Sequence, residues 1–163
     1  MGYKPKDGFP YYFDLAKNLD YLSLFTSEST FDFLSSISEE KAKYRYESKK
    51  WSIKQIVGHL TDHERIKIFR SFLMSRNYNV ELWGYDQNFL VMNSRFEELT
   101  LNQLLTDYKN VRKSTISFIE SLSDSQLNIK SWARHYEITL VDFLKSIIGH
   151  EIHHINIIKE KYI

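Results

Sequence analysis

The sequence predicts an all-α protein, a four-helix bundle, from three observations. Only five glycines and two prolines occur, and both prolines lie within the first ten residues, so little interrupts the backbone after Pro10. Apolar residues recur at three- to four-residue steps over long stretches, which is typical of amphipathic helices. Three of these stretches begin with a helix-capping pattern. Four such rods bury their apolar stripes most simply as a bundle.

The first predicted helix covers residues 13–36. Its apolar residues keep an approximate helical spacing: Leu15, Leu19, Leu22, Phe25 and Phe33. The Ser/Thr cluster at 26–30 predicts a kink or a break, because hydroxyl side chains compete for backbone hydrogen bonds. A polar connection containing aromatic residues follows at 38–52.

The second and third helices have clear start signals. Ser52 and Gln55 form an S-x-x-Q capping box, and this helix is expected to fade at 75–77. Thr100 and Gln103 repeat the pattern at the start of a helix that continues to about residue 122. Between them lies a long loop, 77–99, able to hold a crossover connection or short elements that cap one end of the bundle.

The fourth helix follows a second loop at 128–137. Thr139 with Asp142 provides a weaker cap, and apolar residues continue at helical spacing to the C-terminus. No repeat, low-complexity tract or linker is visible, so we predict one domain over residues 1–163.

Charge and composition exclude several classes of protein. Twenty-two basic residues balance 21 acidic ones and form no long run, which argues against a nucleic-acid partner. No apolar run approaches the roughly 20 residues of a membrane-spanning helix, and no secretory signal is readable, so we expect a cytoplasmic protein. The chain has no cysteine, so a metal must be held by nitrogen and oxygen ligands.

The histidines are concentrated in two of the predicted helices. Five of the six fall in two clusters, and each cluster contains an H-x-x-x-H pair: His59 with His63, and His150 with His154. Residues four apart differ by only about 40° around a helix, so both imidazoles can face one metal ion. Each pair continues the apolar stripe of its helix, where a buried imidazole needs a partner. Hydrogen bonds to neighbouring groups are one explanation; two clusters at ligand spacing favour a divalent metal.

The motif His150-Glu151-x-x-His154 also matches the helical zinc-protease signature. Such a site needs a third protein ligand. Only residues 155–163 follow, and Glu160 lies more than a turn and a half beyond His154, too far to share its metal. The third ligand must therefore come from upstream. A site of His59, His150 and His154 would keep an open position for water or substrate, and we expect no peptidase activity.

Two segments resemble the DinB/YfiT-like family. YRYESKKWSIKQIVGHLTDHER (44–65) is similar to the family's entry into its second helix, and GHEIHHINIIKEKY (149–162) to its last helix. The resemblance implies a four-helix bundle, often dimeric, that holds one divalent metal through three histidines, here His59, His150 and His154. Some relatives are thiol transferases that use bacillithiol or a related small thiol.

The sequence allows more than one role for each of the remaining candidate residues. Glu151 is either a general base beside the metal, a solvated glutamate, or a salt-bridge partner of Lys159 or another helix. His63 is a fourth ligand, a proton shuttle or a packing residue. His153 is expected at the periphery.

Charged and aromatic residues lie near these histidines in the sequence. Asp62, Glu64 and Arg65 read as a charged flank of the second helix. Asp86 either reaches the open metal position or is an exposed loop residue. Trp83 and Tyr85, in the same loop, are candidates to line a pocket.

The sequence thus predicts a metal-dependent enzyme acting on a small-molecule substrate, thiol S-transferase-like or a hydrolase, with zinc, nickel, manganese or iron as the ion. The alternative is a non-catalytic metal-binding or stress-response bundle. A homodimer is expected from the resemblance.

Overall fold

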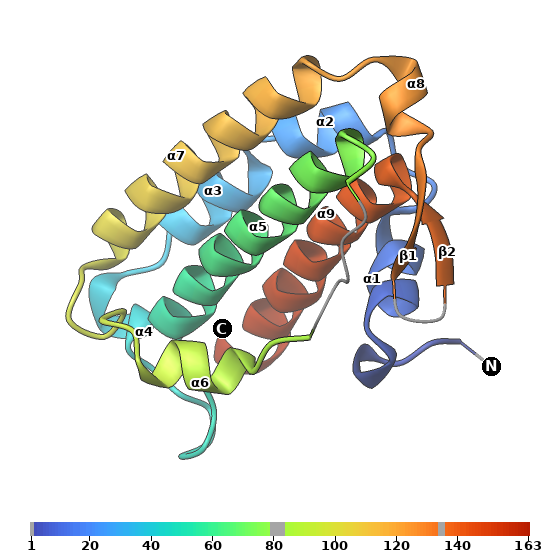
Figure 1. Ribbon diagram of the computed structural model, residues 1–163. Coiled ribbons are helices and arrows are strands. Elements are labelled where there is room, and N and C mark those ends of the chain that lie inside the picture. Colours follow the sequence, from blue (N-terminus) through green and yellow to red (C-terminus); the bar gives the residue numbers. More distant parts are fainter. Residues whose placement is uncertain (1, 79–83, 134–135) are drawn as a thin grey trace.

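The computed structural model describes residues 2–78, 84–133 and 136–163 and shows a helical bundle (Figure 1). Three long helices form its frame: α5 (Ile53–Ser75), α7 (Leu101–Glu120) and α9 (Leu140–Ile157), which continues into the π-helical turn η2 (Ile158–Tyr162). Helix α5 packs against both α7 and α9. The remaining side of the bundle is filled by three short helices: α1 (Phe9–Ala16), α2 (Tyr21–Thr26) and α3 (Ser29–Ser35). The predicted four-helix bundle is confirmed.

The prediction of one helix over residues 13–36 was wrong, because this segment forms parts of three short helices. Its break at the Ser/Thr cluster is confirmed, because Ser27 adopts an extended conformation between α2 and α3. A second break at residues 17–20 was not expected. There the Asp20 carboxylate accepts a hydrogen bond from the Ser23 amide at 2.8 Å and starts α2 anew.

The two capping boxes predicted at Ser52 and Thr100 are present, and the weaker cap predicted at Thr139 is a capping box as well. The Gln55 amide donates to Ser52 Oγ at 3.2 Å, while Gln55 Oε1 accepts from the Ser52 amide at 3.1 Å. Thr100 with Gln103 and Thr139 with Asp142 repeat this exchange. Each box satisfies amides that a helix leaves without a partner in its first turn.

Both connections contain elements of their own. The long loop holds the short helix α6 (Gln87–Met92), which packs against α5, as α4 (Glu39–Ala42) does (Figure 1). The loop predicted at 128–137 was wrong in part. After α8 (Asp124–Leu127), strands β1 (Lys130–Ala133) and β2 (Tyr136–Thr139) pair antiparallel, with Lys130 opposite Thr139. A short 3-10 turn, η1 (Pro5–Asp7), precedes α1.

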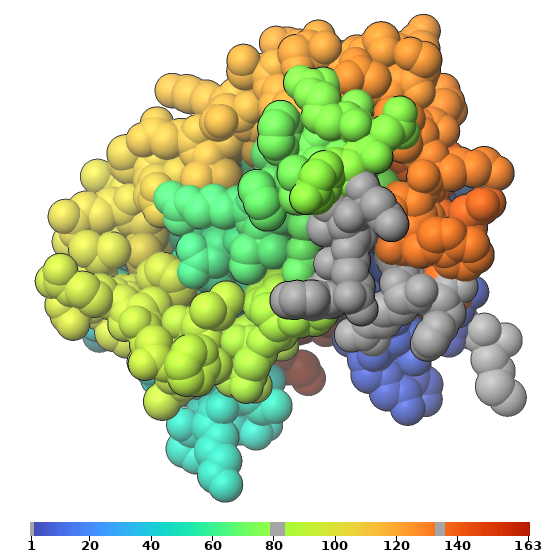
Figure 2. All heavy atoms as spheres, in the orientation of Figure 1, coloured from blue at the N-terminus to red at the C-terminus, as the bar shows by residue number. Residues whose placement is uncertain are grey.

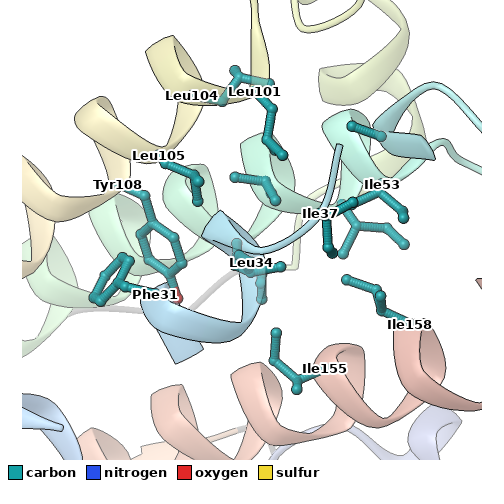
Figure 3. Packing of buried hydrophobic residues seen from close by; sticks show 14 of the residues in the cluster. Phe31, Leu34, Ile37, Ile53, Leu101, Leu104, Leu105, Tyr108, Ile155 and Ile158 are labelled. Carbon is teal, nitrogen blue, oxygen red and sulfur yellow. The ribbon is translucent and has the colours of Figure 1, made fainter. Parts of the chain in front are cut away.

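The hydrophobic core is divided into two clusters. The first joins α3, α5, α7 and α9 and includes the residues labelled in Figure 3: Phe31, Leu34, Tyr108, Ile155 and Ile158 among others. The second joins α2, α5, α7, α8, β2 and α9 and includes Phe25, Met74, Ile119, Phe143 and Ile148.

The division falls at the same level of α5 and α9. On α5, the last residue of the first cluster is Leu60. On α9, the second cluster ends at Ile148, and the first cluster begins at Ile155. On α9, His150 and His154 lie between the two clusters; on α5, His63 follows Leu60, whereas His59 directly precedes it.

Helix α1 crosses α9 at a position where only glycine fits. A Cβ atom built on Gly149 would lie 1.8 Å from the carbonyl oxygen of Tyr12. The close approach brings the Tyr12 ring edge-on to the imidazole of His150, with centroids 4.9 Å apart. Within the described ranges, none of the helices combines the length and the apolar character that a bilayer span requires.

Candidate metal centre

Three histidines converge between α5 and α9. One ligand nitrogen each from His59, His150 and His154 lies within 4.8 Å of the others, and within the described part of the chain these residues form the one such group of His, Cys, Asp or Glu side chains. Nε2 of His59 is 3.1 Å from Nε2 of His150. The three side chains are 2 %, 2 % and 8 % exposed. The structure therefore brings together the three histidines that the sequence singled out.

The imidazoles in this centre are held neutral. Burial lowers the pKa of His59 from 6.5 to about 4. Burial likewise lowers the pKa of His150 and of His154 well below the usual value, and the neighbouring histidines add to the effect. Neutral imidazole is the form that ligates a metal ion.

His63 lies one turn beyond His59 and outside the group of three. Its ring stacks on that of His150, with centroids 3.7 Å apart and 18° between the planes. Nδ1 is 2.7 Å from the hydroxyl of Tyr85, whereas Nε2 is buried and has no hydrogen-bond partner among the described residues. His63 is thus in contact with the centre, with one ring nitrogen held and the other open to a partner.

His153 is turned to the periphery, as predicted. It is half-buried, and its Nδ1 lies 3.1 Å from the hydroxyl of Tyr11 on α1.

Glu151 takes the salt-bridge alternative in this structure. Its Oε1 accepts a hydrogen bond from Thr30 Oγ1 at 2.7 Å, and its Oε2 accepts from Tyr108 and from Arg112 Nη2. The side chain is 5 % exposed. Because both carboxylate oxygens are engaged with α3 and α7, the contacts favour a structural role for Glu151 over that of a base.

Glu64 belongs to the same buried network, which sequence reasoning missed. Arg112 Nε donates to both of its carboxylate oxygens at 3.1 Å, and both side chains are at most 3 % exposed. The expectation of a solvated flank was therefore wrong for Glu64, although Asp62 and Arg65 do pair at the surface. The available signal was Arg112 itself, which continues the apolar stripe of Leu105 and Tyr108 on α7.

A cavity of about 260 Å³ reaches the histidines from outside. Two of the histidines, His63 and His150, line it together with the rings of Tyr12, Tyr85 and Phe143. Tyr85 thus lines a pocket, as expected.

Among the described residues of the long loop, the second candidate, Asp86, does not reach the centre. Asp86 is exposed and caps α6 by accepting a hydrogen bond from the Phe89 amide at 3.0 Å. Trp83 and the sixth histidine, His135, lie outside the described residues.

Comparison with known proteins agrees with the resemblance seen in the sequence. Among curated proteins none matches this chain. The solved structure of YfiT from Bacillus subtilis, described as a probable metal-dependent hydrolase with an unusual four-helix bundle topology, matches with a TM-score of 0.72 at 17% sequence identity. The match covers 98% of this chain and 91% of that one, so the two proteins share a fold. The family model of the DinB superfamily matches residues 25–158, and the chain therefore belongs to the DinB superfamily.

Proposed function

We propose that the protein is a metal-dependent enzyme whose single divalent ion is held by His59, His150 and His154. The observation that carries the proposal is the convergence of three buried, neutral imidazole nitrogens from two helices within 4.8 Å. A hydrogen bond between the Nε2 atoms of His59 and His150 joins only two of the three imidazoles and does not account for the third.

The donor set fits the ion. Ligand nitrogens 2.0–2.1 Å from a tetrahedral ion lie about 3.4 Å from one another, and the two Nε2 atoms of His59 and His150 are already 3.1 Å apart. Imidazole ligands suit several divalent metals, so the proposal covers zinc, nickel, manganese or iron. When bound, the ion would supply a Lewis acid that lowers the pKa of a water or a thiol.

His63, which lines the cavity, is placed to hold a proton there. Burial raises the pKa of Tyr85 to about 12, so its hydroxyl stays protonated and can donate to Nδ1 of His63. The imidazole proton then resides on Nε2, which lacks another partner among the described residues. In this arrangement Tyr85 sets the tautomer, and His63 offers a proton to a bound molecule.

The reaction class we favour is hydrolysis or thiol transfer on a small molecule. The description of YfiT as a probable metal-dependent hydrolase supports hydrolysis. The absence of cysteine from the sequence means that a reacting thiol would have to arrive from solution. The cavity that reaches the histidines supports catalysis over a non-catalytic bundle, because structural metal sites are closed. We further propose that the protein forms a homodimer and does not bind nucleic acid.

Metal analysis tests the centre directly. Protein purified without chelator or a nickel column should carry about one divalent ion per chain, measured by plasma mass spectrometry. His150→Ala and His154→Ala should each lose the ion, since two remaining ligands hold a metal poorly. His153→Ala is the matched control and should keep it. Full metal content in either ligand variant would refute the proposed site.

A further inference from the structure

The indole ring of Trp51 lies against two of the three candidate ligands. Its ring centroid is 4.8 Å from that of His59, with 51° between the planes, and 6.3 Å from that of His154, with 22° between the planes. His59 belongs to α5 and His154 to α9. Because aromatic rings at such distances favour particular mutual orientations, one indole restricts an imidazole on each of the two helices.

The backbone of Trp51 is tied to the same two helices. Trp51 directly precedes Ser52, the N-cap of α5. Its carbonyl oxygen accepts a hydrogen bond from the hydroxyl of Tyr162 at 2.6 Å. Tyr162 is buried and belongs to η2, the π-helical continuation of α9. The start of α5 and the end of α9 therefore fix the position from which the indole extends.

The connection that carries Trp51, residues 43–52, is also attached to η2 through its tyrosines. The ring of Tyr162 is edge-on to that of Tyr46, with centroids 5.0 Å apart, and to that of Tyr44, with centroids 6.1 Å apart. Figure 2 shows this connection, in turquoise, beside the C-terminal residues, in dark red, at one edge of the molecule. A segment that the sequence predicted only as a polar connection is thus held against α9 by aromatic contacts.

Trp51 contacts the ligands that the cavity does not reach. Of the three candidate ligands, His150 lines the cavity, whereas neither His59 nor His154 is among the described residues that line it, and Trp51 is not among them either. Trp51 is half-buried, but the two imidazoles against it are almost fully buried. The indole therefore covers His59 and His154, while the cavity meets the centre at His150.

An apolar cover of this kind affects a metal site in two ways. It controls the access of water and the local dielectric constant, and so the strength of the attraction between the ion and its ligands. It also holds the ligand side chains in place before the ion binds, so less conformational freedom is lost on binding.

From these contacts we propose that Trp51 is a positioning residue of the metal centre: its indole orients His59 and His154 and excludes water from their side, so that exchange with solvent takes place through the cavity at His150. The inference rests on the proposed function in taking these three histidines as the ligands. It adds a residue outside the ligand set that determines how tightly the ion is held and how many water molecules reach it.

Zinc affinity and the visible spectrum of the cobalt-loaded protein test this role. Trp51→Leu should lose zinc affinity by about ten-fold or more, as for other residues that support metal ligands. Its cobalt absorption should weaken, because entry of water raises the coordination number and four-coordinate cobalt absorbs most strongly. Trp51→Phe keeps an aromatic ring and should retain most of the affinity. Trp132→Leu, which removes an exposed tryptophan of β1, is the matched control and should match the wild type.

A second measurement needs no variant at the site. Cobalt held beside an indole quenches its emission, so tryptophan fluorescence should fall when cobalt binds the wild type and Trp132→Leu, and the fall should be smaller in Trp51→Phe. Circular dichroism and urea denaturation of the metal-free proteins check that every variant is folded.

The outcomes separate Trp51 from the centre itself. If the wild type binds zinc, then unchanged zinc affinity and an unchanged cobalt spectrum in Trp51→Leu would overturn the inference alone, even if that variant were less stable. Emission that does not respond to bound cobalt would also overturn it. A wild type that takes up no metal would instead refute the proposed metal centre, and the role of Trp51 with it.

Discussion

Arg112 of α7 donates from Nε to both carboxylate oxygens of Glu64 of α5, at 3.1 Å each. Its Nη2 also binds Glu151 of α9. Glu64 directly follows His63 in the sequence, and Glu151 directly follows His150. The ion pairs therefore fix the two histidine-bearing helices against α7 at the level of the candidate centre.

Removing this arginine should destabilise the protein strongly. Arg112→Met leaves two buried carboxylates without their cation, and breaking a buried pair in this way typically costs about 3–5 kcal/mol. Urea denaturation measures the change in the free energy of unfolding. Arg65→Met is the matched control, because Arg65 pairs with Asp62 and Asp107 at the surface, where an ion pair contributes about 0–1 kcal/mol. Equal losses in the two variants would show that the network does not stabilise the fold.

His59 rather than His63 should supply the ligand from α5. His59 belongs to the group of three nitrogens, whereas His63 stacks on His150 and binds Tyr85. The prediction is that His59→Ala loses zinc affinity by a larger factor than His63→Ala, as measured by competition with a chromophoric chelator. A larger loss of zinc affinity in His63→Ala would show that the ligand from α5 is His63, one turn further along the helix, and would contradict this prediction.

Gly149→Ala should destabilise the protein although alanine favours a helix by about 1 kcal/mol over glycine. The added methyl group would overlap the Tyr12 carbonyl oxygen at 1.8 Å, and the backbone of α1 would have to move. We expect a net loss of about 1–3 kcal/mol, as for other overpacked sites. Thermal denaturation measures it, with Gly2→Ala as control, since Gly2 has no neighbour within 4 Å of a Cβ atom. An unchanged or raised melting temperature would argue against the close crossing.

Peptidase activity should be absent despite the H-E-x-x-H motif. Glu151, which would have to act as the base, has both carboxylate oxygens occupied by Thr30, Tyr108 and Arg112. Incubation of zinc-loaded protein with casein should release no peptides above background. Cleavage that requires metal and disappears in Glu151→Gln would contradict this prediction.

The thiol-transferase alternative predicts that metal-loaded protein accelerates the attack of a small thiol on a haloaromatic electrophile. A bound cation deprotonates a coordinated thiol, so the rate should fall when metal is removed and in His59→Ala. Adduct formation is followed optically with bacillithiol, glutathione and cysteine in turn. Equal rates for stripped and loaded protein with every thiol would leave hydrolysis as the proposed reaction.

The helix starts and the histidine cluster were predictable because their signals are local. Ser52, Thr100 and Thr139 each lie three residues before their capping partner, and the pairs His59/His63 and His150/His154 lie one turn apart. Because each of the four apolar stripes must be buried against the others, a bundle was the simplest arrangement of the helices.

The features that could not be predicted depend on contacts between distant residues. Nothing near Glu64 in the sequence indicates that its partner is Arg112, 48 positions later. The hairpin of β1 and β2 is only four residues per strand, too short for alternation to be distinguished from a loop. The break before α2 depends on a single aspartate cap.

The histidines of α9 and His63 lie between two hydrophobic clusters, so the residues that form the candidate site differ from those that provide the apolar packing. Each cluster joins at least three helices, so either half of the bundle has its own apolar packing, to which the imidazoles add little. The histidines can therefore be exchanged while the flanking halves keep their shape, unlike the buried ion pairs of Arg112 at the same level. Replacing His150 and His63 with leucine should therefore yield a protein that melts at a higher temperature and is inert, the trade-off expected where a reactive site occupies core positions.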